Sequence, residues 1–170
     1  MPSNIWNDFD VETVRGFIVQ AISRFITSDK ILLDLPNTPS NIDSKLHEVC
    51  ISHKLAIHLE NILREQFLIP EGVAIDIEYN RHGGDVKSDS ARNNIRPDIL
   101  IHSRGNDDQN LLVIELKKDT NLGIRNSHLN DDITRIKEMC KQNGDYRYLF
   151  GFVLVAEPTT IRMEYSFTED

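Results

Sequence analysis

Three residues in the middle of the chain have the types and spacing of a metal site: Asp98, Glu115 and Lys117. Asp98 follows Pro97 at the start of an apolar run, and Glu115 and Lys117 flank Leu116 at the end of another. Two neighbouring carboxylates repel each other unless a divalent cation neutralises them. Because carboxylate oxygens suit Mg²⁺ or Mn²⁺, the set predicts a site for one of these ions.

Two predicted strands position this set, at residues 97–102 and 111–117. Turn-forming residues at 103–110 separate them, which indicates an antiparallel hairpin. The start of one strand then lies opposite the end of the next, so we expect Asp98 beside Glu115. Glu115 and Lys117 share a face because strand side chains alternate. The alternative is a structural Glu–Lys pair where the chain reaches the surface.

The remaining elements predict an α/β fold, with a mixed central sheet flanked by helices. Apolar periodicity and turn formers predict helices at 9–27, 43–67 and 127–142 and strands at 73–79 and 148–156. The strand at 148–156 is apolar on both faces, which is typical of the centre of a sheet. The length and the absence of repeats predict one domain spanning 1–170.

Glu48 is a further acidic residue that could join the site. At helical spacing it shares a face with a row of apolar residues, Ile51, Leu55, Leu59 and Ile62. An acid at the head of such a face points into the domain or at its rim. The alternative is a first-turn carboxylate that interacts with the helix dipole.

These motifs resemble the PD-(D/E)XK nuclease superfamily, which has the restriction-endonuclease-like fold. Pro97-Asp98 matches the first half of its signature and Glu115-Leu116-Lys117 the second, with sixteen residues between the two acids. The order helix, three strands, helix, strand also resembles the family's common core, over residues 43–157. The helix at 9–27 is an addition to that core.

The resemblance implies a Mg²⁺-dependent (or Mn²⁺-dependent) endonuclease that hydrolyses phosphodiester bonds in DNA, with RNA as the alternative substrate. Asp98 and Glu115 would ligate the metal, with the Leu116 carbonyl and Glu48 completing its shell. Lys117 would orient or activate the attacking water. A bound metal polarises the phosphoryl oxygen and acidifies its water, which is the chemistry that such a reaction needs.

The net charge of −8 opposes a general grip on nucleic acid, because affinity comes largely from neutralised phosphates. One segment has the opposite balance and is a candidate for nucleic-acid binding, with a solvated loop as the alternative. Between residues 80 and 96 it carries Arg81, Lys87, Arg92 and Arg96 against Asp85 and Asp89.

Several wider expectations follow. A non-catalytic module that binds nucleic acid or protein on the same fold is the alternative function. Cutting two strands favours a homodimer or larger assembly, with the helix at 9–27 as its surface.

No apolar run suits a membrane span and no secretory signal is expected at the N-terminus. Cys50 and Cys140 fall in predicted helices and are interpreted as buried thiols, which predicts a cytoplasmic protein.

Overall fold

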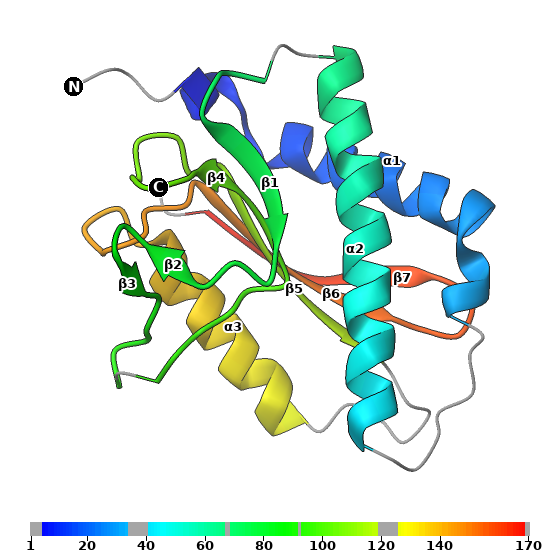
Figure 1. Cartoon of the computed structure of the whole chain (residues 1–170). Coiled ribbons are helices and arrows are strands. Elements are labelled where there is room, and N and C mark those ends of the chain that lie inside the picture. Colours follow the sequence, from blue (N-terminus) through cyan, green and yellow to red (C-terminus); the bar gives the residue numbers. More distant parts are fainter. Residues whose placement is uncertain (1–4, 34–40, 67–68, 92, 119–125, 169–170) are drawn as a thin grey trace.

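The computed structural model describes residues 5–33, 41–66, 69–91, 93–118 and 126–168 (Figure 1). Within these ranges it is a mixed α/β structure with a mixed central sheet. The helices are α1 (Val11–Ser28), α2 (Asn41–Gln66) and α3 (Asn126–Cys140), with short 3-10 turns at Ile5–Asp8 and Lys30–Leu32. The sheet strands are β1 (Val73–Ile77), β4 (Ile99–Ser103), β5 (Leu112–Lys118), β6 (Phe150–Ala156) and β7 (Ile161–Phe167), and a separate hairpin comprises β2 (Arg81–His82) and β3 (Asp85–Val86).

The five strands run in the order β1-β4-β5-β6-β7. Neighbours are antiparallel except for β5 and β6, which are parallel and are joined through α3. Parallel neighbours need such a crossover, whereas β4 and β5 need only a tight turn. The predicted β4–β5 hairpin and the predicted interior position of β6 are therefore confirmed.

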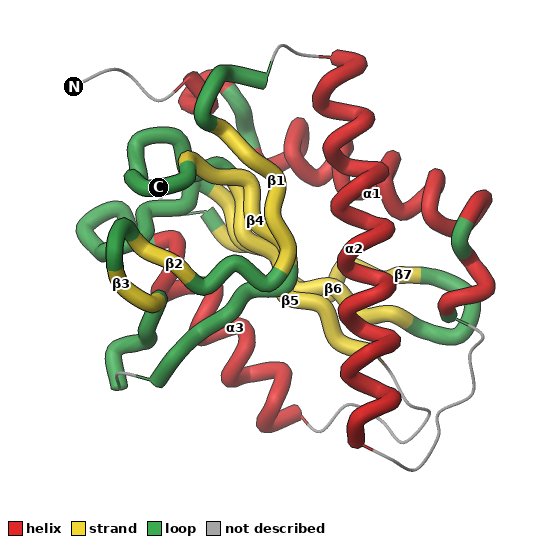
Figure 2. Tube along the Cα trace, viewed as in Figure 1, coloured by secondary structure: helices red, strands yellow, loops and turns green. Residues whose placement is uncertain are grey.

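Helices cover both faces of the sheet. Figures 1 and 2 show α1 and α2 on one side of the strands and α3 on the other. Strand β5 divides its side chains accordingly: Leu112, Ile114 and Leu116 pack in the apolar cluster under α1 and α2, and Val113 packs under α3. Glu115 and Lys117 follow Val113 on the α3 face, as strand alternation requires.

Helix α1 begins after Asp10, whose Oδ1 accepts a hydrogen bond from the Thr13 backbone N at 2.7 Å. This N-cap explains why the helix begins two residues after the predicted start at residue 9. Its apolar side chains Val14, Ile18 and Phe25 are buried within the chain. That face is therefore not available as the surface of a dimer.

The sequence interpretation missed two features. Strand β7 forms an edge of the sheet beyond β6, although no strand was predicted after residue 156. The connection between residues 80 and 94 contains the β2–β3 hairpin and a bridge from Ser88 to Asn94, so it is more ordered than predicted.

Gly151 on β6 marks the closest approach between the sheet and α3. A Cβ atom there would lie 2.3 Å from Ile136 Cγ2 and 2.9 Å from Cys140 Sγ. Real side chains do not approach this closely, so the packing of α3 requires glycine at this position.

No helix in the described part of the chain is long and apolar enough to cross a membrane. The two cysteines are not joined in a disulfide. Cys140, the last residue of α3, is buried as predicted, but the prediction for Cys50 is wrong because its side chain is exposed on α2.

Candidate active site

The β4–β5 register brings the two predicted carboxylates together. Ile99 pairs with Ile114, so the next position places Asp98 opposite Glu115. Asp98 Oδ2 also accepts a hydrogen bond from the Leu116 backbone N at 2.7 Å. The main chain of β5 therefore fixes the Asp98 carboxyl beside Glu115.

Both carboxyls are withdrawn from water, and neither has its ordinary acidity. Burial raises the pKa of Asp98 to about 6, although the hydrogen bond from Leu116 opposes the rise. Burial, and then the charge of Asp98, raises the pKa of Glu115 to about 8. The raised pKa values mean that these carboxyls keep their protons to a higher pH than free carboxyls do, and a bound cation would displace such protons.

Helix α3 supplies the nearest balancing charges. Arg135 Nη1 donates to Glu115 Oε1 at 3.0 Å and to Asp132 Oδ1 at 3.1 Å. Lys117 Nζ lies 3.4 Å from Asp132 Oδ2. Burial lowers the pKa of Lys117, but the carboxylates of Asp132, Glu115, Asp98 and Glu48 more than offset this and raise it. Lys117 is therefore a charged ammonium group at the mouth of the site.

Glu48 reaches the same place from α2, on the other side of the sheet. Its Oε1 accepts a hydrogen bond from the Lys118 backbone N at 3.0 Å, at the last residue of β5. Its charge contributes to raising the pKa of Asp98. The predicted inward orientation of Glu48 is thus confirmed, with the carboxylate held at the end of the strand.

These side chains line one pocket of about 200 Å³. Its lining residues are Glu48, Val49, Glu78, Arg96, Asp98, Glu115, Lys117 and Arg135. Arg96 Nη2 lies 3.4 Å from Glu78 Oε1, so these two residues form an ion pair at the rim. Glu78 has a left-handed backbone with φ of 49°, which is unfavourable for this residue type and is often seen near functional sites.

The donor set fits a hard divalent cation that keeps much of its water. Among the residues that the structure describes, no three His, Cys, Asp or Glu side chains converge into a ready-made metal centre. Mg²⁺ commonly binds through one or two carboxylates, with water and substrate phosphate as the other ligands. Asp98 and Glu115 can fill that role. Ligation by Glu48 or by the Leu116 carbonyl stays a prediction.

The four predicted nucleic-acid contacts have different surroundings. Arg96 lines the pocket and Arg81 is exposed on β2, whereas Arg92 lies outside the described residues. Lys87 is buried, and its Nζ donates to the Arg81 carbonyl at 2.6 Å. Burial lowers the pKa of Lys87 to about 8. In this conformation Lys87 therefore adds nothing to a basic surface, contrary to expectation.

Sequence reasoning did not assign Asp132, Arg135 or Glu78 to the site. The Asp132 side chain is buried and contacts Lys117 and Arg135. The spacing of Asp132 and Arg135, three residues apart on one helical face, was the available signal. Nothing in the local sequence of Glu78 indicates its position at the rim.

No protein-family model, curated protein or solved structure matches this chain.

Proposed function

We propose that this chain is a metal-dependent nuclease with a restriction-endonuclease-like fold, which hydrolyses phosphodiester bonds in DNA. One observation carries the proposal. Asp98 and Glu115, on adjacent strands, face each other in a small pocket with raised pKa values and with Lys117 beside them. Such an arrangement is typical of a site that binds a divalent cation and a phosphate together.

The order of elements supports the fold assignment. Helix α2 precedes three antiparallel strands, and α3 then leads to β6, which is parallel to β5. Asp98 immediately precedes β4, and Glu115 and Lys117 lie near the end of β5, which supports the resemblance to the PD-(D/E)XK superfamily. Helix α1 and strand β7 are additions at the two ends of that core.

Each side chain has a role in the proposed reaction. Asp98 and Glu115 would hold Mg²⁺ or Mn²⁺, with Glu48 and the Leu116 carbonyl as further ligands. When bound, the metal supplies a polarised phosphoryl oxygen and a more acidic water. Lys117 donates hydrogen bonds to the attacking water and offsets the charge that develops on the phosphate. Asp132 positions Lys117, to which it is ion-paired.

Arg135 has a different role, because it already interacts with Glu115, one of the two proposed metal ligands. Its guanidinium group donates to Glu115 and carries a permanent charge. A bound cation would compete with it for Glu115 and leave donors free for a phosphate oxygen. Arg135 thus holds Glu115 until the metal and substrate arrive.

The test combines metal binding with cleavage. Titration of Mn²⁺ into the full chain, followed by calorimetry, should show binding that Asp98→Asn and Glu115→Gln weaken by at least about tenfold. The same variants should lose Mg²⁺- or Mn²⁺-dependent cleavage of DNA. Asp131→Asn is the matched control, since Asp131 is an exposed acid on α3, the same helix that carries Asp132 and Arg135.

A non-catalytic module is the second candidate function. The observation in its favour is that Arg135 and Lys117 already pair with Glu115 and Asp132, so part of the negative charge is balanced without a metal. Such a module would bind no Mn²⁺ through Asp98. Absence of both metal binding and cleavage in the wild-type chain would therefore support the module and reject the nuclease.

The proposal extends to location and assembly. Cys50 and Cys140 form no disulfide, which agrees with a reducing cytoplasmic compartment. A homodimer or a larger assembly would supply a second active site for the second strand, or the basic surface that this acidic chain lacks. Sedimentation of the chain with and without DNA measures the assembly.

A further inference from the structure

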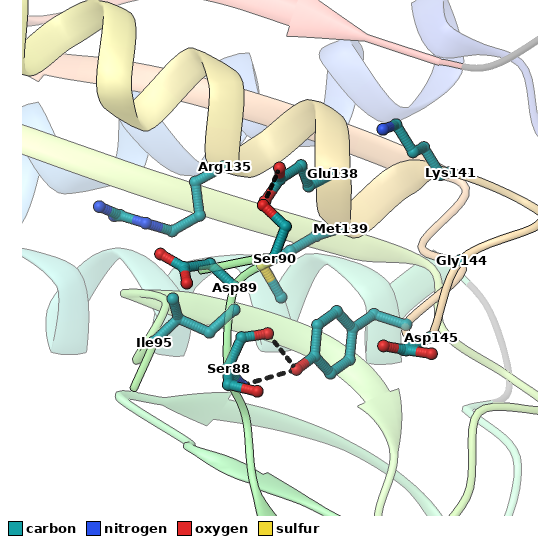
Figure 3. A pocket seen from close by; sticks show the side chains of 11 residues that line it. Ser88, Asp89, Ser90, Ile95, Arg135, Glu138, Met139, Lys141, Gly144 and Asp145 are labelled. Carbon is teal, nitrogen blue, oxygen red and sulfur yellow. Dashed lines mark hydrogen bonds between the residues drawn. The ribbon is translucent and has the colours of Figure 1, made fainter. Parts of the chain in front are cut away.

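A second pocket lies next to the candidate active site. It has a volume of about 170 Å³ and lies between α3 and a wall formed by residues 88–90 and Ile95 (Figure 3). Arg135 lines both this pocket and the one that contains Asp98 and Glu115. In Figure 3, Arg135 and Asp89 lie at one end of the pocket and Asp145 at the other, so the pocket extends away from the carboxylates along α3.

The walls of this pocket are partly apolar and firmly held. Ile95, Met139 and Tyr146 line it and are buried. The Tyr146 hydroxyl accepts a hydrogen bond from the Ser88 backbone N and donates one to the Ser88 carbonyl, both at 2.7 Å. Ser90 Oγ donates to Glu138 Oε1 at 2.8 Å and so links the segment to α3. These hydrogen bonds hold the walls in place, as in a preformed ligand site with apolar walls and a few polar groups.

The charges of the lining exclude a second phosphate. Three carboxylates line the pocket: Asp89, Glu138 and Asp145. The two cations of the lining are Arg135, which already pairs with Glu115 and Asp132, and Lys141. An uncharged ligand with hydrogen-bond donors is therefore favoured over an anion.

We propose that this pocket binds an unpaired nucleobase of the strand whose phosphodiester lies at Asp98 and Glu115. This inference depends on the proposed nuclease function, because the shared Arg135 makes the two pockets neighbouring subsites. A base within a duplex is stacked and paired, so it can enter a side pocket only from a single strand, a flap or a frayed end. The substrate class is thus DNA with an unpaired nucleotide next to the cut.

The acidic character of the whole chain supports this choice. With a net charge of −8, few phosphates can be neutralised, and long duplex DNA would be gripped poorly. Binding one base through apolar contact and hydrogen bonds supplies affinity that does not depend on basic residues. Asp89 already accepts hydrogen bonds from Ala91 N, Asn93 N and Asn93 Nδ2, and Glu138 accepts one from Ser90. The remaining acceptor capacity of Glu138 and Asp145 favours bases with exocyclic amino groups, such as adenine, over thymine.

The first test needs neither metal nor activity. In EDTA, dAMP is titrated into the ¹⁵N-labelled full chain, and the amide signals of Ser90, Gly144 and Asp145 should shift. Deoxyribose 5-phosphate, which has no base, should leave them unchanged, and dTMP should bind more weakly than dAMP. Equal shifts with deoxyribose 5-phosphate, or no shifts at these amides, would overturn the proposal.

A filling variant tests the location. Ser90→Trp places a large side chain at an exposed position of the pocket wall and should weaken dAMP binding by about tenfold or more. Ser23→Trp is the matched control, since Ser23 is exposed on α1, across the sheet. Equal loss of binding in both variants would contradict the assignment.

A cleavage experiment separates the two proposals. With Mn²⁺, the chain is given a single-stranded oligonucleotide, the same oligonucleotide with scattered abasic sites, and bis(p-nitrophenyl) phosphate, which has no base. We expect cuts next to intact bases to exceed those next to abasic sites by about tenfold in kcat/KM. Hydrolysis of the small diester without that preference overturns the base pocket alone. Absence of all hydrolysis while dAMP still shifts Ser90 overturns the nuclease and leaves a nucleotide-binding pocket.

Discussion

Two groups of acidic side chains on the sheet differ in how their charge is balanced. In the paired cluster, comprising Asp76, His102 and Arg104, one carboxylate meets two partners: His102 Nε2 lies 3.0 Å from Asp76 Oδ2, and Arg104 Nε donates to the same oxygen at 2.8 Å. In the carboxylate cluster, comprising Asp98 and Glu115 with their neighbours on α3, two acids face each other.

The acidities of the two clusters differ accordingly. Burial alone would raise the pKa of Asp76, but hydrogen bonds from Arg104 and His102 more than offset it and hold the pKa well below the usual 3.8. In the carboxylate cluster burial prevails, and the pKa values of Asp98 and Glu115 rise. The paired cluster is complete without a ligand. In the carboxylate cluster, Asp98, Glu115 and Asp132 outnumber the cations Lys117 and Arg135, so negative charge is in excess. If the proposed function is right, this contrast separates a structural ion pair from a binding site.

The largest expected effect concerns the lysine beside the carboxylate cluster. If that cluster is catalytic, Lys117→Met should reduce metal-dependent DNA cleavage by about 10²–10⁴-fold, because a donor to the attacking water is lost. Lys118→Met should retain activity, since β5 directs that side chain to the opposite face. Initial rates with Mg²⁺ measure both. Similar rates for wild type and Lys117→Met would remove Lys117 from the mechanism.

A second prediction exchanges the acids of the two clusters for amides and measures stability. Asp76→Asn should lower the free energy of unfolding by about 1–3 kcal/mol, because buried His102 loses a charged partner. Glu115→Gln should change it by less than about 1 kcal/mol without metal, because repulsion with Asp98 is removed as well. Urea denaturation in EDTA measures both. A larger loss for Glu115→Gln would reverse the comparison.

The smallest effect is the pH dependence of stability without metal. Folding raises the pKa of Glu115 from 4.5 to about 8, so the folded chain binds more protons than the unfolded chain between these values. The free energy of unfolding should therefore fall as pH rises through this range, and Glu115→Gln should flatten the fall. Asp76 acts in the opposite sense, since its contribution is lost as pH falls below about 3.8. An unchanged slope in Glu115→Gln, measured by urea denaturation in EDTA, would contradict the raised pKa.

Much of the carboxylate cluster could be predicted from sequence because its geometry is local. Asp98 and Glu115 lie on strands joined by a short turn, so strand alternation and an antiparallel register are enough to bring them together. The orientation of Glu48 could be predicted too, because an acid at the N-terminal end of an apolar helical face points into the domain or at its rim. Each of these predictions uses the side-chain repeat of a strand or a helix, and none requires knowledge of the tertiary packing.

The contributions of α3 could not be predicted in this way. Whether Asp132 and Arg135 face Lys117 and Glu115 depends on the rotation of α3 about its axis, which packing on β5 and β6 decides. The burial of Lys87 likewise depends on Tyr146, which is distant in sequence and whose ring lies under its ammonium group. Strand β7 did not require tertiary information. The alternation of apolar and polar residues through Ile161–Phe167 is a strand pattern in the sequence itself, so this strand could have been predicted.

The geometry of the candidate site depends on Gly151, which is not one of the residues that line it. With no side chain there, α3 lies close enough to the sheet for Arg135 to reach Glu115 and for Asp132 to reach Lys117. An added methyl group would clash with the Ile136 and Cys140 side chains, so these side chains or α3 itself would have to shift. A substitution at Gly151 is therefore expected to disturb the Arg135–Glu115 and Lys117–Asp132 pairs through the packing of α3, although Gly151 belongs to neither pair.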